Sequence, residues 1–169
     1  GDLRVLHSFP TRRSSDLQPK DGGYTQEGLG DPEGALFHRL YPVQAIGSML
    51  KECDFVVVCL PLTPSTHHLI NDEVLRHMKP EAYLIDIGRG EIVEQAALLT
   101  ALQERRIAGA ALDVFEEEPL NPQSPFWHLP NVYVTPHVSG VSTEYRRRAV
   151  ELFILNLTSY LNGLPLQNV

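Results

Sequence analysis

The sequence predicts an α/β fold built on a parallel β-sheet with flanking helices. Short apolar runs alternate with helical patterns from residue 43 to the end of the chain. Three of these runs end in polar clusters, at residues 85–90, 111–119 and 134–140. Strands that alternate with helices at this interval indicate βαβ units with right-handed crossovers, and therefore a parallel sheet.

The first half of this pattern contains two helices and two strands. Apolar residues recur at helical spacing over residues 43–50, and residues 55–60 form a continuous apolar run that is typical of a strand buried on both faces. Asn71 can cap a short helix that extends to Met78, because its side chain can accept a hydrogen bond from the first turn. A second strand is expected at residues 82–87.

The second half repeats the alternation and ends in a long helix. A helix is expected at residues 94–106, where alanine and leucine form one apolar stripe. Strands are expected at residues 110–115 and 132–135, and a closing helix at residues 141–161. The chain is therefore expected to contain four strands of one parallel sheet.

The polar clusters come directly after three of the predicted strands. In open parallel sheets, ligands bind just beyond the carboxyl ends of the strands, so successive loops can bring side chains to one crevice. The clusters supply an arginine (Arg89), three consecutive glutamates (residues 116–118) and a histidine (His137). The spacing therefore predicts one shared site.

Arg89 and His137 are suited to binding an anion and transferring a proton. The guanidinium of Arg89 offers a planar fork that matches a carboxylate, and it can also polarise an adjacent carbonyl. Its neighbours Gly88 and Gly90 carry no side chain, which lets the backbone approach a ligand closely. The alternative for Arg89 is a surface residue at the end of a strand. His137 suits proton transfer because the charge of a histidine changes near neutral pH.

In their amino-acid sequences and in their order along the chain, residues 85–90, 111–119 and 134–140 resemble the NAD-binding domain of the D-isomer-specific 2-hydroxyacid dehydrogenases. This family includes the glyoxylate/hydroxypyruvate reductases and phosphoglycerate dehydrogenase, and the resemblance runs from about Leu36 to Val169. It implies a truncated Rossmann-like sheet. It also implies an oxidoreductase that transfers a hydride between NAD or NADP and a small 2-hydroxy or 2-keto acid.

The resemblance assigns three catalytic residues. Arg89 would hold the substrate carboxylate, His137 would donate the proton, and Glu118 would pair with His137. Glu118 is the glutamate immediately before the proline, so Glu116 and Glu117 are expected to be solvated neighbours.

The resemblance also assigns the contacts to the cofactor. Asp113 would accept a hydrogen bond from the nicotinamide carboxamide, although it could instead cap a turn at the end of its strand. Phe126 and Trp127 are expected to fill a hydrophobic gap rather than to stack on the cofactor. The residues expected to contact the cofactor are Leu60, Pro61, Ile87, Gly88, Arg89, Asp113, His137 and Gly140.

The chain is expected to fall into three parts, at residues 1–17, 18–41 and 42–169. Residues 7–17 resemble the translation of a common sequencing adapter, so the first part is interpreted as an artefactual scar; the alternative is a basic N-terminal arm or a transit peptide. Residues 3–6 could be the stub of an upstream strand. The second part is expected to be a loop, and the third a partial NAD-binding domain with a closing helix.

A glycine-rich segment at residues 28–34 comes close to a dinucleotide-binding fingerprint but does not fit it. It has one residue too many before the last glycine, no strand leads into it, and Asp31-Pro32 would break the helix that must follow. The true fingerprint, and the acidic residue that would bind the ribose, are expected upstream of Gln18. The chain is therefore interpreted as a fragment that is inactive on its own.

Composition and charge argue against several classes of partner. A formal net charge of −7 argues against a nucleic-acid or anionic-membrane surface. No apolar stretch is long enough to span a bilayer and no signal peptide is recognised, so a cytoplasmic protein is expected. Cys53 and Cys59 are expected to be reduced core thiols. No metal site is expected, because the adjacent His67 and His68 lack a cysteine or carboxylate at ligand spacing.

Three functions remain open. The first is a fragment of a dehydrogenase whose full-length parent is a homodimer that acts on a small 2-keto or 2-hydroxy acid. The second is a dinucleotide-sensing binding module, similar to the transcriptional corepressors that share this fold and retain Arg89, Glu118 and His137. The third is that the chain has no function as given, because half a cofactor site binds little. Turnover of a 2-keto acid by the full-length protein would separate the first from the second.

Overall fold

The computed structural model describes residues 4–5 and 39–167. The described residues belong to two compact units, one with residues 4–5 and 39–139 and the other with residues 140–167. Most of the expected scar and of the loop that follows it, including the glycine-rich segment, lies outside the described residues.

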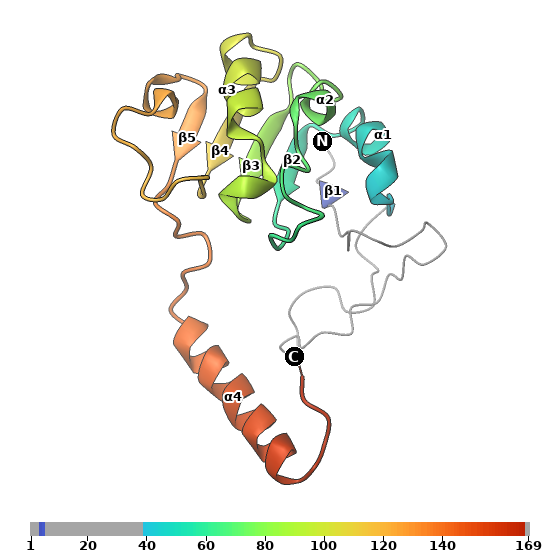
Figure 1. The fold of residues 1–169 in the computed structure, drawn as a ribbon, viewed down its shortest axis with the longest axis vertical. Helices are drawn as coiled ribbons and strands as arrows, with labels where there is room; N and C mark the ends of the chain where they lie inside the picture. The colour runs from blue at the N-terminus through green and yellow to red at the C-terminus, as the bar shows by residue number, and fades with distance from the viewer. Residues whose placement is uncertain (1–3, 6–38, 168–169) are drawn as a thin grey trace. The chain divides into compact units, whose positions relative to one another are not determined.

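The first unit is built on a five-stranded parallel sheet in the order β1-β2-β3-β4-β5 (Figure 1). Its strands are β1 (Arg4–Val5), β2 (Phe55–Val58), β3 (Tyr83–Asp86), β4 (Gly109–Leu112) and β5 (Val132–Val134). The predicted α/β fold is therefore confirmed. Each of the four predicted strands ends earlier at its carboxyl end than the sequence pattern suggested.

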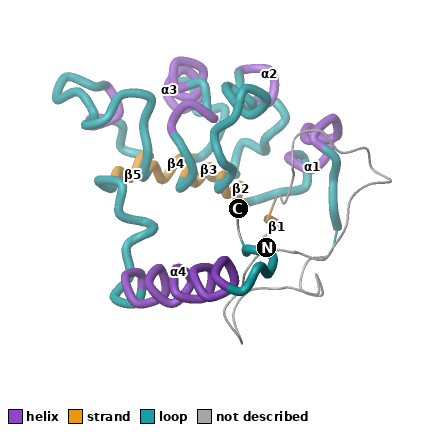
Figure 2. The backbone as a smooth tube through the Cα atoms, turned by 60° about the horizontal axis from the view of Figure 1, so that its bottom comes forward, coloured by secondary structure: helices purple, strands orange, loops and turns teal. Residues whose placement is uncertain are grey.

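Three helices pack on one face of this sheet (Figure 2). They are α1 (Ile46–Leu50), which follows the 3-10 turn η2 (Val43–Ala45), α2 (Asp72–Leu75) and α3 (Gln95–Gln103). Two further 3-10 turns, η3 (Gly90–Ile92) and η4 (Pro125–His128), precede α3 and β5 respectively. All three helices were expected at these places in the chain, and each is shorter than its apolar pattern.

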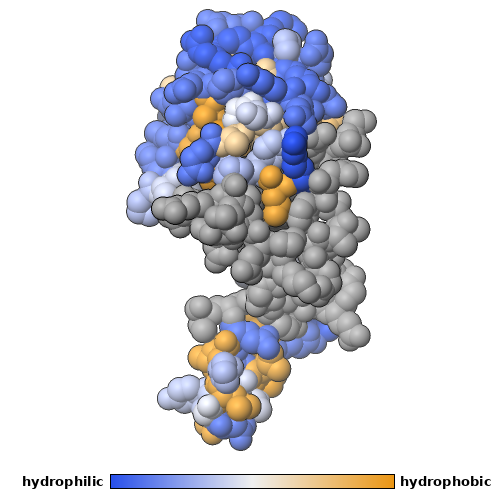
Figure 3. Space-filling model, turned by 90° about the vertical axis from the view of Figure 1, so that its right-hand side faces the viewer, coloured by the Kyte–Doolittle hydropathy of each residue, from blue (hydrophilic) through white to orange (hydrophobic). Residues whose placement is uncertain are grey.

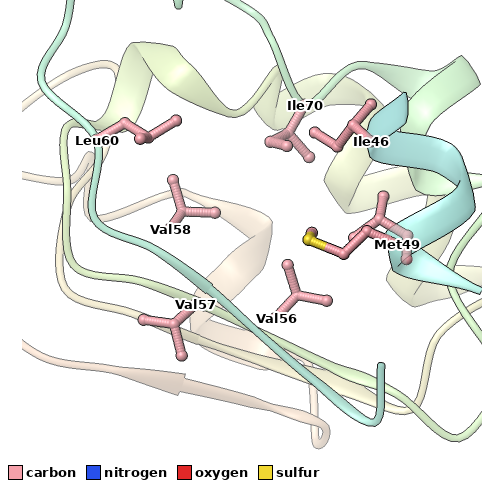
Figure 4. Close-up of a pocket in the computed structure, with 8 residues that line it drawn as sticks. Ile46, Met49, Val56, Val57, Val58, Leu60 and Ile70 are labelled. Carbon is pink, nitrogen blue, oxygen red and sulfur yellow. The ribbon is translucent and has the colours of Figure 1, made fainter. Parts of the chain in front are cut away.

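The hydrophobic core lies between these helices and the sheet. Leu50 from α1, Leu84 from β3 and Leu98 from α3 are completely buried. A cavity of about 10 Å³ between α1 and β2, shown in Figure 4, is at the lower limit for a single water molecule, so this part of the core is tightly packed. The predicted cap of α2 is confirmed, since the Asn71 side chain accepts a hydrogen bond from the Val74 amide at 3.0 Å.

The opposite face of the sheet is exposed, so the prediction that residues 55–60 are covered on both faces is wrong. Right-handed crossovers between consecutive neighbouring strands place the helices on the same face, and only every second side chain of β2 and β3 enters the core. On the other face, the stacked rings of Phe55 and Tyr83 are 42% and 41% exposed, and Tyr133 is 76% exposed. Parallel sheets are normally covered on both faces. This aromatic surface is therefore unusual for the fold.

The edge of the sheet beside β2 is occupied in part by β1. Arg4 pairs with Val56 and Val5 pairs with Val57 in parallel register. The pairing agrees with the expected stub of a strand at residues 3–6. The interpretation of residues 7–17 as a scar stays a prediction.

The second unit contains the closing helix α4 (Tyr145–Leu161), which begins at Tyr145 rather than at Val141. None of the residues of α4 is buried, and Figure 3 shows hydrophobic side chains on the surface of this helix. Phe153 and Tyr160, for example, are 66% and 71% exposed. In the part of the chain that the structure describes, no helix has the length and apolar character needed to cross a membrane.

Candidate active site

The three predicted loops begin side by side at the carboxyl edge of the sheet. The Asp113 amide donates to the Asp86 carbonyl at 2.9 Å, and the Thr135 amide donates to the Leu112 carbonyl at 3.0 Å. These hydrogen bonds continue the pairing just beyond the ends of β3, β4 and β5. The structure thus brings the three polar clusters to one edge of the sheet.

Glu118 and His137 form a direct pair. His137 Nδ1 lies 2.7 Å from Glu118 Oε2, and Glu118 Oε1 accepts a hydrogen bond from the Phe115 amide at 3.0 Å. Burial would raise the pKa of Glu118, but the hydrogen bonds from His137 and Phe115 and the positive charge of Arg89 hold it below its ordinary value. A carboxylate at Nδ1 fixes the orientation of the ring and leaves Nε2 free to face a ligand.

The carboxylate of Asp113 holds the loop that carries His137. It accepts hydrogen bonds from the Thr135 hydroxyl at 2.5 Å, the Val138 amide at 2.9 Å and the Ser139 amide at 2.8 Å. Burial alone would raise the pKa of Asp113, but the hydrogen bonds from Ser139, Thr135 and Val138 keep it well below its usual range. His137 has a φ of 53°, a left-handed conformation that costs about 1–2 kcal/mol. Hydrogen bonds to an ionised acceptor contribute about 1.5–3 kcal/mol each, so three of them offset this strain.

Arg89 lies close enough to Glu118 for its positive charge to lower the pKa of that carboxyl group. Arg89 is exposed, and its Nη1 donates to the Gly88 carbonyl at 2.7 Å.

The two glycines beside Arg89 let segments of the chain pack closely together. A Cβ on Gly90 would lie 1.9 Å from the carbonyl carbon of Phe115, and one on Gly88 would lie 3.1 Å from the Leu60 carbonyl oxygen. Gly90, and less strictly Gly88, thus allow a close approach to the chain's own backbone, and the expectation that they also allow a close approach to a ligand stays a prediction.

Asp86 is a buried acidic residue at this edge that the sequence analysis did not single out. Its side chain is 1% exposed, and its Oδ1 accepts a hydrogen bond from the Gly88 amide at 3.0 Å, within the turn that leads to Arg89. Burial raises the pKa of Asp86 to about 7, the Gly88 hydrogen bond opposes the rise, and the charge of Asp113 adds to it. The available signal was the alternation along β3, which places its last residue in the buried row.

A pocket of about 620 Å³ opens beside the carboxylate–imidazole pair. Part of its apolar wall is Trp127, which is 49% exposed and whose indole Nε1 donates to the Asn121 carbonyl at 3.0 Å. Phe126 is instead buried against the ring of Phe115. The expectation that both aromatic residues fill a hydrophobic gap is therefore confirmed for Phe126 and wrong for Trp127. The pocket has the size of a small-molecule site.

Glu116 is exposed, as expected, but it also makes structural contacts that the sequence pattern did not indicate. Its Oε1 accepts a hydrogen bond from the Gln95 amide at 3.0 Å and lies 3.3 Å from His68 Nε2. Glu116 therefore caps the first turn of α3, where free amide groups need an acceptor. The ring of His68 stacks on that of His67 at 4.0 Å. Among the described residues, no three potential ligands form a group that could hold a metal ion.

The residues expected to contact the cofactor differ in their exposure. Pro61 and Ile87 are exposed at the carboxyl edge, whereas Leu60 and Gly88 are buried. Gly140 belongs to the second unit. The assignment of all these residues to the cofactor stays a prediction.

The two cysteines differ in exposure. Cys53 is buried as expected, and its thiol donates to the Met49 carbonyl at 3.2 Å. Cys59 is exposed, contrary to the prediction, because burial alternates along this segment and Cys59 lies between the buried residues Val58 and Leu60. Partial burial and the charge of Asp86 raise the pKa of the Cys59 thiol.

Comparison with known proteins gives consistent relatives. Residues 31–139 match the family model for the NAD-binding domain of D-isomer specific 2-hydroxyacid dehydrogenases. The chain is 48% identical over 118 residues to a glyoxylate reductase of Thermofilum pendens, which covers 70% of this chain and 35% of that protein. It is 44% identical over 123 residues to glyoxylate/hydroxypyruvate reductase B of Cronobacter sakazakii, covering 73% and 38%. The chain thus spans little more than a third of the length of these relatives.

Solved structures agree with this result. A D-isomer specific 2-hydroxyacid dehydrogenase from Xanthobacter autotrophicus Py2, in complex with NADPH and MES, has a TM-score of 0.72 and 40% identity over 76% of this chain and 53% of that chain. An NADPH-dependent glyoxylate/hydroxypyruvate reductase from Sinorhizobium meliloti, in complex with NADP and sulfate, has a TM-score of 0.69 and 37% identity over 76% and 42%. The chain belongs to the D-isomer specific 2-hydroxyacid dehydrogenase family, and it corresponds to part of the NAD-binding domain.

Proposed function

We propose that this chain forms the nucleotide-binding side of the active site of a reductase that uses NADH or NADPH to reduce a small 2-keto acid, such as glyoxylate or hydroxypyruvate. The observation that carries the proposal is the 2.7 Å contact between His137 Nδ1 and Glu118, at the edge of the sheet where Arg89 also lies. The names of the relatives support the substrate class, and the bound NADPH and NADP of the related structures support the cofactor.

The pocket beside the pair fits the nicotinamide end of such a cofactor. It is large enough for the ring and combines an apolar wall with a polar end. When bound, the cofactor supplies the hydride. The residues assigned to it in this unit are those expected from the family, with Asp113 at the carboxamide and His137 beside the ring.

The chain's own residues supply the proton and hold the substrate. His137 donates a proton from Nε2 to the carbonyl oxygen as negative charge develops there, because Glu118 occupies its Nδ1 and orients the ring. Arg89 exchanges the Gly88 carbonyl for the substrate carboxylate, which its planar fork binds through two hydrogen bonds. A cytoplasmic location and a homodimeric full-length protein belong to the same proposal.

The proposal is tested with the full-length protein that contains this chain. His137→Ala should lower the rate of glyoxylate reduction about 100-fold or more, because the proton donor is lost, while the affinity for NADPH stays nearly unchanged. Arg89→Lys should lower kcat/KM about 10-fold, because an ammonium group cannot form the two-bond clamp.

Arg146→Lys, at an exposed position on α4, is the matched control and should leave kcat/KM unchanged. Near-native turnover by the His137→Ala protein would show that His137 is not the acid. A wild-type protein that binds NADPH but reduces no 2-keto acid would favour the dinucleotide-sensing alternative.

A further inference from the structure

Asp113 is bonded to the loop on both sides of His137 and not to the histidine ring. Thr135, two residues before His137, and Val138 and Ser139, the two residues after it, all donate to this one carboxylate. An ionised carboxylate has about four acceptor positions, so the loop uses most of them. A single buried side chain therefore fixes the backbone of the whole segment.

The backbone at His137 depends on this anchor. Its φ of 53° is in the left-handed region, which is unfavourable for a residue with a Cβ. His137, Val138 and Ser139 are exposed, so burial in the core does not fix their conformation. Together with the bond from the Thr135 amide to the Leu112 carbonyl, the hydrogen bonds to Asp113 connect this loop to the buried end of β4.

The same region of the chain also fixes the partner of His137. Glu118 is held by the Phe115 amide, and Phe115 lies two residues after Asp113. The hydrogen bonds that Asp113 accepts from the loop keep its pKa well below the usual range. Its carboxyl group therefore stays ionised at the near-neutral pH at which histidines change charge. Both members of the pair are thus held at the exit of β4.

We propose that Asp113 is a positioning residue for His137, which holds the imidazole in line with Glu118 by accepting three hydrogen bonds from the loop after β5. The effect on catalysis rests on the proposed function, whereas the holding of the loop does not. The family resemblance assigns Asp113 only to the nicotinamide carboxamide. That contact would use the remaining acceptor position and would act on cofactor affinity instead of on turnover.

Kinetics of the full-length protein separate the two roles. Asp113→Asn replaces one acceptor oxygen with an NH₂ group, which cannot accept from the loop amides. We expect kcat for glyoxylate to fall about 10- to 100-fold, whether or not a weakened carboxamide contact also raises KM for NADPH. Thr135→Val removes one donor and leaves the carboxylate intact, so a smaller fall in kcat is expected. A higher KM for NADPH with unchanged kcat would overturn the proposal.

The double variant tests whether Asp113 acts through His137. In the His137→Ala protein, Asp113→Asn should cause no further loss of the residual rate, because there is no imidazole left to position. The same fold-loss in both backgrounds would contradict the proposal.

Amide hydrogen exchange on the 169-residue chain tests whether Asp113 holds the loop, and it needs no measurement of activity. The Val138 and Ser139 amides should be protected in spite of their exposed positions, and should exchange at least about 10-fold faster in Asp113→Asn. The Ile70 amide, which donates to the Ile92 carbonyl away from this loop, is the control and should not change. Equal exchange of Val138 and Ser139 in both proteins would overturn the proposal. Absence of reductase activity in the full-length protein would refute the proposed function and leave the exchange result valid.

Discussion

Asp86 and Asp113 are neighbouring buried carboxyl groups whose ionisation differs. They lie at the ends of adjacent strands, and each holds a loop that carries a proposed catalytic residue. Asp113 has three hydrogen-bond donors that stabilise its charge, whereas the Gly88 amide does not compensate for the burial of Asp86. The loop of His137 is therefore anchored by an ionised group, and the turn before Arg89 by a group that changes charge near neutrality.

The raised pKa of Asp86 makes stability depend on pH. Because the folded chain favours the neutral acid, its free energy of unfolding should fall as pH rises from about 4 to about 7 and then level off. The shift from 3.8 to about 7 corresponds to a loss of up to about 4 kcal/mol. Asp86→Asn keeps an oxygen for the Gly88 amide and removes the charge. Urea denaturation should therefore show the variant gaining stability relative to the wild type between about pH 5 and about pH 8.

All other titratable groups are present in both proteins. The difference in stability between Asp86→Asn and the wild type therefore isolates the contribution of Asp86. A stability difference that is the same at both ends of that pH range would contradict a raised pKa. A variant that is less stable than the wild type at both ends would show that the carboxyl proton makes an essential hydrogen bond.

The role of a single residue could be predicted from the sequence where that role depends on its position just after a predicted strand. Arg89, Glu118 and His137 follow apolar runs at a recognisable spacing, and the structure places Glu118 and His137 in contact. The anchoring role of Asp113 and the exposure of Trp127 depend on contacts with segments distant in the sequence. Spacing along the chain does not reveal such contacts.

Gly90 shows how closely two loops of the sheet edge approach each other. A Cβ at this position would lie 1.9 Å from the carbonyl carbon of Phe115 and 2.5 Å from the Glu116 amide nitrogen, and backbone atoms cannot move aside as a flexible side chain can. We expect Gly90→Ala to lower the free energy of unfolding by about 3 kcal/mol or more. Gly140→Ala, which has nothing within 4 Å of the new Cβ, is the control and should change it by less than about 0.5 kcal/mol. Comparable stability of the two variants would contradict so close an approach of the two loops.

The strands and helices were predicted in type and order but not in extent. The apolar run at residues 55–60 continues beyond the last paired residue of β2, so hydrophobicity alone does not mark where pairing ends. The same run of valines suits a strand with one or two covered faces. Only the positions of α1, α2 and α3, which lie on one side of the sheet, decide between these possibilities.

The uncovered face of the sheet is the feature of the first unit that most affects the behaviour of the isolated chain. Phe55, Tyr83 and Tyr133 present aromatic rings to solvent on that face. Burying such rings against a second copy removes apolar surface from water, so the chain should self-associate at micromolar concentration. Tyr133→Lys should shift the elution in size-exclusion chromatography toward the monomer.

Gln103→Lys adds the same charge at an exposed position of α3 and is the matched control; it should leave the elution unchanged. A wild-type chain that elutes as a monomer at all concentrations would refute this prediction. An equal effect of both substitutions would show that net charge, and not the aromatic face, governs association.

Trp127 gives the pocket beside the Glu118–His137 pair a built-in optical signal. It is the only tryptophan among the 169 residues, and about half of its surface is open to the pocket side and to solvent. When light at the long-wavelength edge of the absorption band excites tryptophan and not the six tyrosines, the emission of the chain therefore comes from one known place. A molecule that displaces water from the indole will change the wavelength and intensity of that emission, so occupancy of the pocket can be followed in the unmodified protein without an attached dye.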